Sequence, residues 1–506
     1  MPDHAANVPE GRIAVVDVGS NSLRLVVFER LGAALLPLLN EKVMCGLGRG
    51  IADTGRLNRD GVELALANMQ RFVTLARGLG VDHLAIIATA AVREATDGVA
   101  FAEMIERLCG VQVRIIDGVE EARLSATGVL AGIPDADGVV GDLGGGSVEL
   151  VRVGGSGGAP AIGAGVTLPL GPLRLAEQGD NRKGIAETIE RVVAGTAILR
   201  EASGKTLYLV GGAWRAIARL HMEQARYPLH IIHQYTITRA QAESFLDIVA
   251  RLSRRSLERI TTINRKRLEV VPMAATILRR LVAAGRPEQL VFSAFGLREG
   301  YAHGLLPAEP RLDPLVAACI GVAGSQSRSR SDGDRLQAWT APLFPALSGS
   351  ARRLHRAACW LSDIAWAEHP DYRAEHAFTR SLRMPVGAIG HAERVFIASV
   401  LHARYGGAAD DPIRAATRPL LDDRAAGEAR SLGLALRLAY TLCGGALDLL
   451  AGVRLVREDD GLVLELPASG SLFTGEAVQR RFDALSRALG LGARSTRRRS
   501  PSPVPA

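Results

Sequence analysis

The chain has 506 residues, of which 47% are hydrophobic and 23% are charged, and its formal net charge is +8. It is too long for one hydrophobic core, since single cores rarely grow past about 250–300 residues, and its composition is typical of an ordinary globular protein with more than one domain. Its five cysteines are widely spaced without a CxxC pair, which argues against a disulfide framework or a zinc knuckle.

Charge and composition also indicate which kinds of partner and which cellular compartment to expect. A net positive charge suits an anionic substrate, whereas aromatic residues at 4% that do not interleave with basic ones argue against specific nucleic-acid binding. Residues 1–12 contain no apolar run, so we expect no signal peptide. The uncharged stretch at residues 153–173 has too many glycines and prolines for a membrane helix. We therefore expect a cytoplasmic protein that does not bind a membrane.

The first 150 residues alternate the patterns of strands and helices, which is typical of a mixed α/β domain. Apolar residues at spacings of three and four predict an amphipathic helix over residues 59–79, and short apolar runs predict strands around it. In chain order these elements are a strand at residues 13–16, the helix at 59–79, strands at 83–89 and 111–116, and a helix that carries Glu120 and Glu121.

A related α/β region follows, and then the chain changes character. A strand at residues 207–210 leads into Gly211-Gly212 and a helix, and a strand at 290–292 ends the region near a proline-rich turn. Beyond a polar linker, the pattern predicts helices over 336–450, a hairpin across Asp460-Gly461 and a last helix over 471–491. The basic, Pro/Ser-rich end is predicted to be disordered.

Two short segments are almost alike, DVGSNS at residues 17–22 and DLGGGS at residues 142–147. Each follows an apolar run and precedes alternating apolar residues, which predicts a strand, a tight turn and a second strand. Small residues in such a turn leave backbone N–H groups free to surround a phosphate. The Asp at the end of the first strand places a carboxylate where a hard cation could be held. Two such turns that face each other would form a cleft that binds phosphate.

Four motifs in order resemble the exopolyphosphatase / guanosine pentaphosphate phosphohydrolase (Ppx/GppA) family over about residues 12–308. They are DVGSNS at residues 17–22, ATAAVREA at 88–95, GVEEARL at 118–124 and DLGGGSVEL at 142–150. The resemblance implies the α/β fold of the actin/Hsp70/sugar-kinase superfold, in which two RNase H-like lobes clasp a phosphate chain.

The resemblance also divides the chain. It implies one RNase H-like lobe over residues 12–135, a second over 136–308 and a mainly helical HD-like domain over 313–490, and the composition adds a disordered basic tail over 491–506. A working HD metal site needs a His-Asp pair, and the segment Leu361-Ser-Asp-Ile lacks the histidine. We interpret the histidines of this domain as structural or surface residues: His355, His369, His376, His391 and His402. We expect the domain to lengthen a substrate channel or to form the contact of a homodimer.

Hydrolysis of a terminal phosphoanhydride requires that the charged oxygens are held, that a cation neutralises charge and that a water is oriented. In the family, the second Glu of the GVEEARL motif activates the water, which implies Glu121 as the base, with Glu120 as a cap or supporting group. From position alone, Glu121 could instead be an acidic residue favoured at a helix N-terminus by the dipole.

The candidate metal ligands for Mg²⁺ flank the glycine turns. Asp142 and Glu149 precede and follow the second turn, and Asp17 contributes from the opposite lobe or shapes its own turn. Glu149 could also be a solvated strand residue, and Arg93 a surface arginine. The predicted phosphate-binding residues are Ser20, Asn21, Ser22, Arg93, Gly144, Gly145, Gly146, Ser147 and Gly212. After Gly212 the chain has Ala213-Trp214-Arg215, where many family members have a Ser/Thr-rich turn.

The leading interpretation is a Mg²⁺-dependent hydrolase that releases terminal orthophosphate from inorganic polyphosphate, that is, an exopolyphosphatase. Hydrolysis of guanosine pentaphosphate is the alternative, because both reactions cleave a terminal phosphoanhydride. A kinase of the same superfold would need an acceptor site, and Glu121 in a water-activating position argues against it. A catalytically silent sensor of polyphosphate or alarmone would lose the base or the metal ligands, all of which are present.

Overall fold

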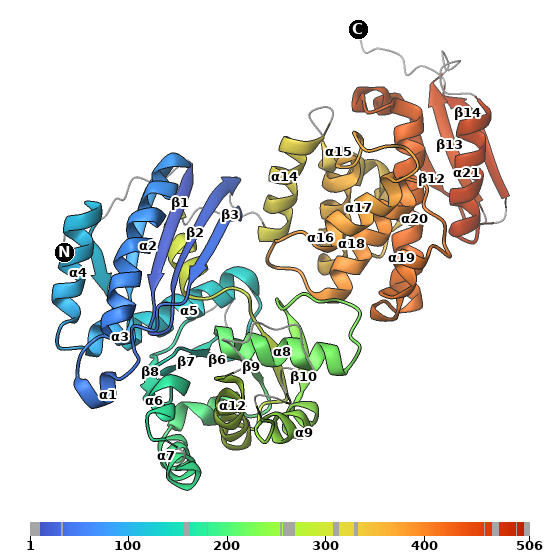
Figure 1. Ribbon diagram of the computed structural model, residues 1–506. Coiled ribbons are helices and arrows are strands. Elements are labelled where there is room, and N and C mark those ends of the chain that lie inside the picture. Colours follow the sequence, from blue (N-terminus) through green and yellow to red (C-terminus); the bar gives the residue numbers. More distant parts are fainter. Residues whose placement is uncertain are drawn as a thin grey trace. The chain divides into compact units, whose positions relative to one another are not determined.

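The computed structural model divides into two compact units, Met1–Arg30 with Leu35–Pro310 and Leu31–Ala34 with Arg311–Ala506 (Figure 1). The first unit contains two α/β lobes, and the second is mainly helical. The structure describes residues 11–31, 34–155, 161–179, 181–253, 256, 269–306, 313–327, 332–459, 461–467, 475–491 and 493–499.

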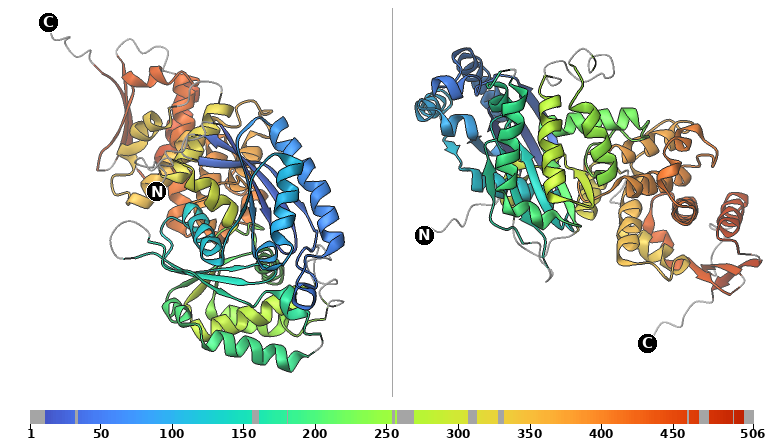
Figure 2. Two further views of the ribbon diagram at one scale, coloured as in Figure 1. Left: turned by 90° about the vertical axis from the view of Figure 1, so that its left-hand side faces the viewer. Right: turned by 90° about the horizontal axis from the view of Figure 1, so that it is seen from below.

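Lobe I is built on a five-stranded sheet in the order β3-β2-β1-β4-β5. Its strands are β1 (Arg12–Val18), β2 (Leu23–Leu31), β3 (Ala34–Val43), β4 (Val81–Ala88) and β5 (Val113–Ile115). Its helices are α1 (Ile51–Thr54), α2 (Arg59–Gly78), α3 (Ala90–Glu94), α4 (Gly98–Cys109) and α5 (Gly118–Gly132). The amphipathic pattern of α2 is confirmed: Met69, Phe72 and Val73 are buried against one face of the sheet together with α4 (Figure 2).

Lobe II is built on a six-stranded sheet in the order β10-β11-β9-β6-β7-β8. Its strands are β6 (Gly138–Leu143), β7 (Val148–Val153), β8 (Val166–Leu168), β9 (Thr206–Val210), β10 (Tyr235–Thr238) and β11 (Gln289–Phe292). Its helices are α6 (Pro172–Ala176), α7 (Arg182–Ala194), α8 (Gly212–Gln224), α9 (Arg239–Val249), α12 (Val271–Gly285) and α13 (Leu297–Gly304). The largest hydrophobic cluster of the lobe joins α7, α8, α9 and α12 to one face of this sheet.

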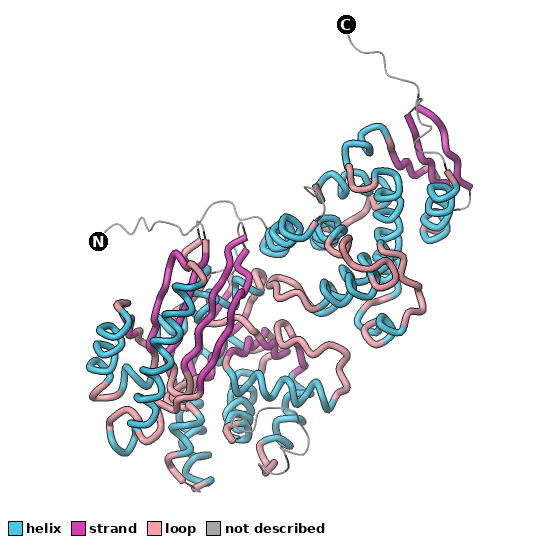
Figure 3. Tube along the Cα trace, turned by 45° about the horizontal axis from the view of Figure 1, so that its top comes forward, coloured by secondary structure: helices cyan, strands magenta, loops and turns pink. Residues whose placement is uncertain are grey.

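The two sheets share one topology. Figure 3 shows the strands of each lobe lying side by side. β1 is antiparallel to β2 and parallel to β4, and likewise β6 is antiparallel to β7 and parallel to β9. Lobe II reads β8-β7-β6-β9-β11 where lobe I reads β3-β2-β1-β4-β5. The predicted fold class, two related α/β lobes followed by a mainly helical part, is therefore confirmed.

Helices α5 and α13 join the two lobes. α5 packs against the strands of lobe II through Ala122, Ala126 and Val129, whereas residues of α13 share a hydrophobic cluster with β1, β2 and β4 of lobe I. The two helices pack so closely that any side chain at Gly300 would clash with the carbonyl oxygen of Leu124. This crossing places the N-terminus of α5, which carries Glu121, beside the glycine turn of lobe II.

The second unit is mainly helical and ends in a small sheet. Its helices are α14 (Pro314–Gln326), α15 (Gly333–Thr340), α16 (Gly349–Trp360), α17 (Arg373–Leu382), α18 (His391–Arg404), α19 (Pro412–Ala415), α20 (Asp423–Cys443) and α21 (Glu476–Ala488). The predicted hairpin is formed by β12 (Arg454–Arg457) and β13 (Gly461–Pro467), which pair antiparallel. Of its predicted turn, Asp460 lies outside the described residues.

The tail differs from the prediction. Residues Ala493–Arg499 form a strand, β14, which pairs parallel with β13, where the sequence predicts a disordered tail from residue 491. The free edge of β13 supplies backbone donors and acceptors that this segment satisfies, and composition alone does not reveal such an edge. Residues 500–506 lie outside the described residues. None of the helices that the structure describes combines the length and the hydropathy that a membrane span requires.

Candidate active site

The two glycine turns have the same closure and face each other. The amide of Gly19 donates to the carbonyl of Ser22 at 3.1 Å, and the amide of Gly144 donates to that of Ser147 at 3.0 Å. A Cβ built at Gly145 would lie 3.0 Å from the Cβ of Ser20, so the absence of a side chain at Gly145 helps the two turns to approach closely. The structure thus brings the predicted halves of the phosphate cradle into one site.

Asn21 and Gly212 lie at the borders of this site. The carbonyl of Asn21 accepts hydrogen bonds from the amides of Cys45 and Gly46, each at 3.1 Å, which fixes the first turn against the loop before α1. Gly212 begins α8 directly after β9, and a Cβ built there would meet nothing within 4 Å. The sequence predicts that Gly212 binds phosphate. Because β9 is the parallel neighbour of β6, Gly212 lies one strand away from the glycine turn that follows β6.

Asp142 and Glu149 are direct partners across the second hairpin. Directly opposed residues of an antiparallel pair project from the same face of the sheet, so the two carboxylates share one side. Ser125 of α5 donates a hydrogen bond to Asp142. Glu149 is 1% exposed, and neither of its carboxylate oxygens forms a hydrogen bond of good geometry among the described residues, although burial, which raises its pKa, is opposed in part by the Ser147 side chain nearby. The alternative of a solvated strand residue is therefore wrong for Glu149.

Glu121 lies in the first turn of α5. The cap of this helix is Asp117, whose side chain accepts from the amide of Glu120 at 2.8 Å. The Glu120 side chain is half-buried and points away from the site toward Arg123, whose Nε lies 2.6 Å from it. Glu121 is 8% exposed. The two neighbours along the chain are thus clearly separated, one directed away from the site and one in it.

Arg93 is the residue that orients Glu121. Its Nη1 lies 3.2 Å from Oε2 of Glu121 and donates to the carbonyl of Ile116 at 2.7 Å. Burial raises the pKa of Glu121 to about 8; Arg93 opposes this shift and the charge of Asp142 adds to it. The alternative of an ordinary surface arginine is wrong for Arg93, whose side chain is 21% exposed.

The buried carboxylates repel one another. Burial raises the pKa of Glu149 well above its ordinary value, and the charge of Glu121 raises it further. Burial also raises the pKa of Asp142, against the hydrogen bond from Ser125. Taking carboxylates out of water beside one another is unfavourable unless a positive charge compensates them.

The donor set has the chemistry of a site for a hard divalent cation. Mg²⁺ binds through one or two carboxylates, with waters and substrate phosphates as its other ligands. The unpartnered oxygens of Glu149 and the adjacent Asp142 fit that demand. No group of three or more His, Cys, Asp or Glu side chains among the described residues is arranged to hold a metal by itself. Any cation here would need further ligands from outside the protein.

Asp17 is engaged differently. Nη1 of Arg298, on α13, lies 2.6 Å from its Oδ2, and both side chains are largely buried. Burial lowers the pKa of Arg298, but the charges of Glu299, Asp17 and Asp142 outweigh it and raise that pKa. The structure therefore gives Asp17 a basic partner, in contrast to Glu149.

Three arginines that the sequence did not identify as site residues lie beside the turns. Arg24 pairs across the first hairpin with Asp17, and burial followed by the charges of Arg298 and Arg215 lowers its pKa to about 9. Nε of Arg215 donates to the carbonyl of Ser293 at 2.9 Å. The alternation after Ser22 could have placed Arg24 on the same face as Asp17, whereas no local signal marks Arg298. These charges make the site attractive to a polyanion.

In the second unit, histidines pair singly with carboxylates instead of gathering. Nε2 of His355 lies 2.7 Å from Glu428, and Nε2 of His402 lies 3.0 Å from Asp411. His376 and His369 pair with Glu368 and Asp371 nearer the surface. Asp363, of the segment that lacks the HD histidine, lies 3.5 Å from Arg404. Within the described part of this unit, the geometry agrees with structural histidines.

Comparison with known proteins supplies the family. The model of the Ppx/GppA phosphatase family matches residues 25–309, and a model described as "Exopolyphosphatase, C-terminal" matches residues 315–494. Similar solved structures include an exopolyphosphatase-like protein, with 24% identity over 58% of this chain and 97% of that chain and a TM-score of 0.52.

Two further solved structures resemble the same part of the chain. They are a Ppx/GppA family member from Aquifex aeolicus, with 23% identity over 60% of this chain and 99% of that chain and a TM-score of 0.50, and an exopolyphosphatase from Cytophaga hutchinsonii, with 22% identity over 57% and 96% and a TM-score of 0.51. At these identities the structures show the fold. Because the first family model covers more than half of its length, the chain belongs to the Ppx/GppA phosphatase family.

Proposed function

We propose that this phosphatase releases terminal orthophosphate from inorganic polyphosphate, with Glu121 as the general base. The observation that carries the proposal is the position of Glu121. It is a buried carboxylate with a raised pKa, oriented by Arg93, beside two facing phosphate-type turns and the Asp142–Glu149 pair. A base with a pKa near the working pH can accept a proton from water.

Each step has a residue of this chain to perform it. The amides of the turn at residues 144–147, with the turn at 19–22 opposite, would receive the terminal phosphoryl group. Mg²⁺, held by Asp142 and Glu149, would neutralise charge on the phosphate oxygens when bound. Glu121 would take a proton from water as the water oxygen bonds to phosphorus. The bridging P–O bond then breaks, and the shortened chain leaves with that oxygen. Arg24 and Arg298 would attract the rest of the polyanion.

The substrate preference rests on the second unit. Its match to the C-terminal model of exopolyphosphatases favours polyphosphate. Guanosine pentaphosphate is the second candidate, because it presents the same terminal phosphoanhydride to the same turns and the family model covers Ppx and GppA proteins alike.

The test is the release of orthophosphate by the purified full chain with Mg²⁺, from long-chain polyphosphate and from guanosine pentaphosphate separately. Glu121→Gln should lower turnover by about 10²–10⁴-fold, because a positioned general base contributes that much. Glu120→Gln is the matched control, since Glu120 is paired with Arg123 at the surface, and should change turnover less than about threefold.

The outcomes separate the candidates. Release from polyphosphate that Glu121→Gln abolishes supports the proposal. Preference for the nucleotide would make the protein an alarmone phosphohydrolase and direct attention to residues 213–215. Binding of both substrates without release from either would show that the site is a sensor, and the proposal would be wrong.

A further inference from the structure

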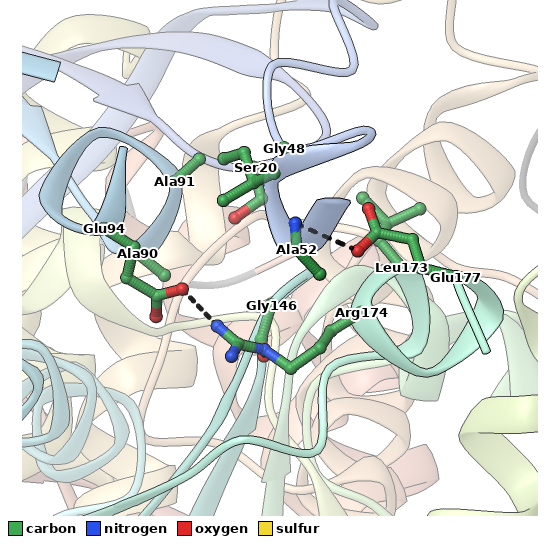
Figure 4. A pocket seen from close by; sticks show the side chains of 11 residues that line it. Ser20, Gly48, Ala52, Ala90, Ala91, Glu94, Gly146, Leu173, Arg174 and Glu177 are labelled. Carbon is green, nitrogen blue, oxygen red and sulfur yellow. Dashed lines mark hydrogen bonds and ion pairs between the residues drawn. The ribbon is translucent and has the colours of Figure 1, made fainter. Parts of the chain in front are cut away.

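The short helix α6 and the residue after it lie between the glycine turn of lobe II and lobe I (Figure 4). A pocket opens here, beside the cradle, and both lobes line it. Its lining includes Glu94 of lobe I and Gly146, Arg174 and Glu177 of lobe II. Neither Arg174 nor Glu177 belongs to the motifs that indicated the function.

On one side, α6 holds the carbonyl groups of the glycine turn. The amide of Gly171 donates to the carbonyl of Gly146 at 3.1 Å, and that of Leu173 donates to the carbonyl of Gly145 at 2.9 Å. Nε of Arg174 also donates to the carbonyl of Gly146, at 2.9 Å. In a planar trans peptide the N–H points opposite to the C=O. These bonds therefore direct the amides of Gly146 and Ser147 away from α6.

On the other side, the same segment contacts lobe I. The guanidinium of Arg174 forms an ion pair with Glu94 on α3, through a different nitrogen from the one that holds Gly146 (Figure 4). The carboxylate of Glu177 accepts from the amides of Gly50 at 2.7 Å and Ala52 at 3.3 Å. Glu94 directly follows Arg93, the residue that orients Glu121.

We propose that Arg174 is a positioning residue that couples the approach of the two lobes to the direction of the cradle amides. One planar guanidinium connects the Gly146 carbonyl in lobe II to the helix that carries Arg93 in lobe I. When Glu94 holds Arg174, the guanidinium is fixed against the Gly146 carbonyl, which the Gly171 amide of lobe II also holds; when the lobes separate, the part of that constraint that comes from Glu94 is lost. The inference rests on the proposed function, because it assigns these amides to phosphate binding.

The chemistry of arginine makes the coupling testable. A lysine keeps the charge but is a single ammonium without a planar fork, so it cannot hold the Gly146 carbonyl and the Glu94 carboxylate in the same geometry. About a third of each side chain of the Glu94–Arg174 pair is exposed, so the pair should contribute little to stability. Substitution should therefore weaken phosphate binding without unfolding the lobes.

The experiment compares Arg174→Lys, Glu94→Gln and the double variant. Arg279→Lys is the matched control, because Arg279 pairs with Asp247 at 2.6 Å and with similar exposure, but within lobe II. Each test variant should raise KM for polyphosphate about 10-fold with a smaller change in kcat, since a small misplacement of binding groups has effects of at least this size. The double variant should resemble the single ones, because both substitutions break one connection. The control should change KM less than about twofold.

A binding measurement separates this inference from the proposed function. Tripolyphosphate is titrated by calorimetry into Glu121→Gln protein with and without Arg174→Lys or Glu94→Gln, and the second substitution should weaken Kd about 10-fold in either case. If wild-type protein releases no phosphate while this loss of affinity is found, the proposed function fails and the positioning role stands. The positioning role of Arg174 would be overturned if Glu94→Gln left Kd for tripolyphosphate unchanged, or if the control Arg279→Lys weakened Kd as much as the test variants do. Either result would count whatever the melting temperature of Arg174→Lys.

Discussion

The two glycine hairpins are alike in backbone but differ in charge. Both close with the same hydrogen bond, at 3.1 Å in lobe I and 3.0 Å in lobe II, and both occupy the same place in sheets of the same order. They differ in the residues that face each other across the hairpin. Lobe I pairs Asp17 with Arg24, whereas lobe II pairs Asp142 with Glu149.

The same hairpin backbone therefore carries different charges in the two lobes. In lobe I the carboxylate is compensated by Arg298 at 2.6 Å, and the half-buried Arg24 adds a second cation. In lobe II the two opposed residues are both acidic, and Glu149 has no hydrogen-bond partner among the described residues. The turns can hold phosphate in either lobe, but their cross-strand pairs favour an anion in lobe I and a cation in lobe II. Exchanging or removing these charges tests the division.

The largest effect within this comparison should come from the acidic pair. Glu149→Gln removes a carboxylate that we propose as a Mg²⁺ ligand, so phosphate release at low Mg²⁺ should fall by about 100-fold and recover in part as Mg²⁺ is raised, since even supporting residues of metal sites contribute about 10–100-fold. Titrating Mg²⁺ in the release assay measures this.

Glu201→Gln, an exposed carboxylate of the same lobe, serves as the control for this titration. If Glu149→Gln needs no more Mg²⁺ than wild type, then the acidic pair is not the cation site, and the contrast between the hairpins has another cause.

A smaller effect is expected at the basic position of lobe I. Arg24→Gln should raise KM for polyphosphate by about 10-fold, because hydrogen bonds to charged groups contribute about 1.5–3 kcal/mol, while kcat should change less than about threefold. The KM of wild type should rise with salt more steeply than that of the variant. Arg71→Gln, which breaks a surface pair with Glu41 in the same lobe, is the control. A loss of kcat alone would assign Arg24 to the chemical step instead of to anion binding.

Much of this site could be predicted because its residues are local. Asp142 and Glu149 flank one tight turn, and the alternation of a hairpin places them on one face without any knowledge of the rest of the chain. Glu121 follows a strand end and a capping Asp117. The sheets could be predicted for the same reason, since each hairpin is a short-range element.

The remaining contacts join segments that are distant in sequence. Arg298 meets Asp17 across 281 residues, and Arg174 meets Glu94 across 80. Such pairs depend on how α13 and α6 pack, which no spacing in the sequence reveals. The strand at Ala493–Arg499 was missed for the same reason, because it pairs with a sheet edge formed more than 25 residues earlier.

The smallest expected effect concerns stability and the charge of Glu121. Its pKa is about 8 in the folded protein, above the ordinary value of 4.5. The unfolded chain therefore releases this proton at a lower pH than the folded protein does. The stabilisation from the protonated side chain is fully present below about pH 4.5 and is lost as pH rises through about 8. Glu121→Gln carries no such charge, so without Mg²⁺ its melting temperature should exceed that of wild type increasingly from pH 5 to pH 8, by roughly 10 °C at pH 8, since one pKa unit corresponds to about 1.36 kcal/mol and the melting temperature shifts by about 2–4 °C per kcal/mol.

Thermal unfolding at several pH values measures this difference, and Glu120→Gln is again the control. Glu120 has a lowered pKa, first because of its hydrogen bond from Arg123, so wild type should be more stable than Glu120→Gln by an amount that stays constant between pH 5 and pH 8 and shrinks only as pH falls below about 4.5. A constant difference for Glu121→Gln between pH 5 and pH 8 would mean that the acidic side of the site is hydrated enough to stay ionised. In that case the acidic hairpin of lobe II would keep its full negative charge even without a cation, and its contrast in charge with the Asp17–Arg24 hairpin of lobe I would be at its largest.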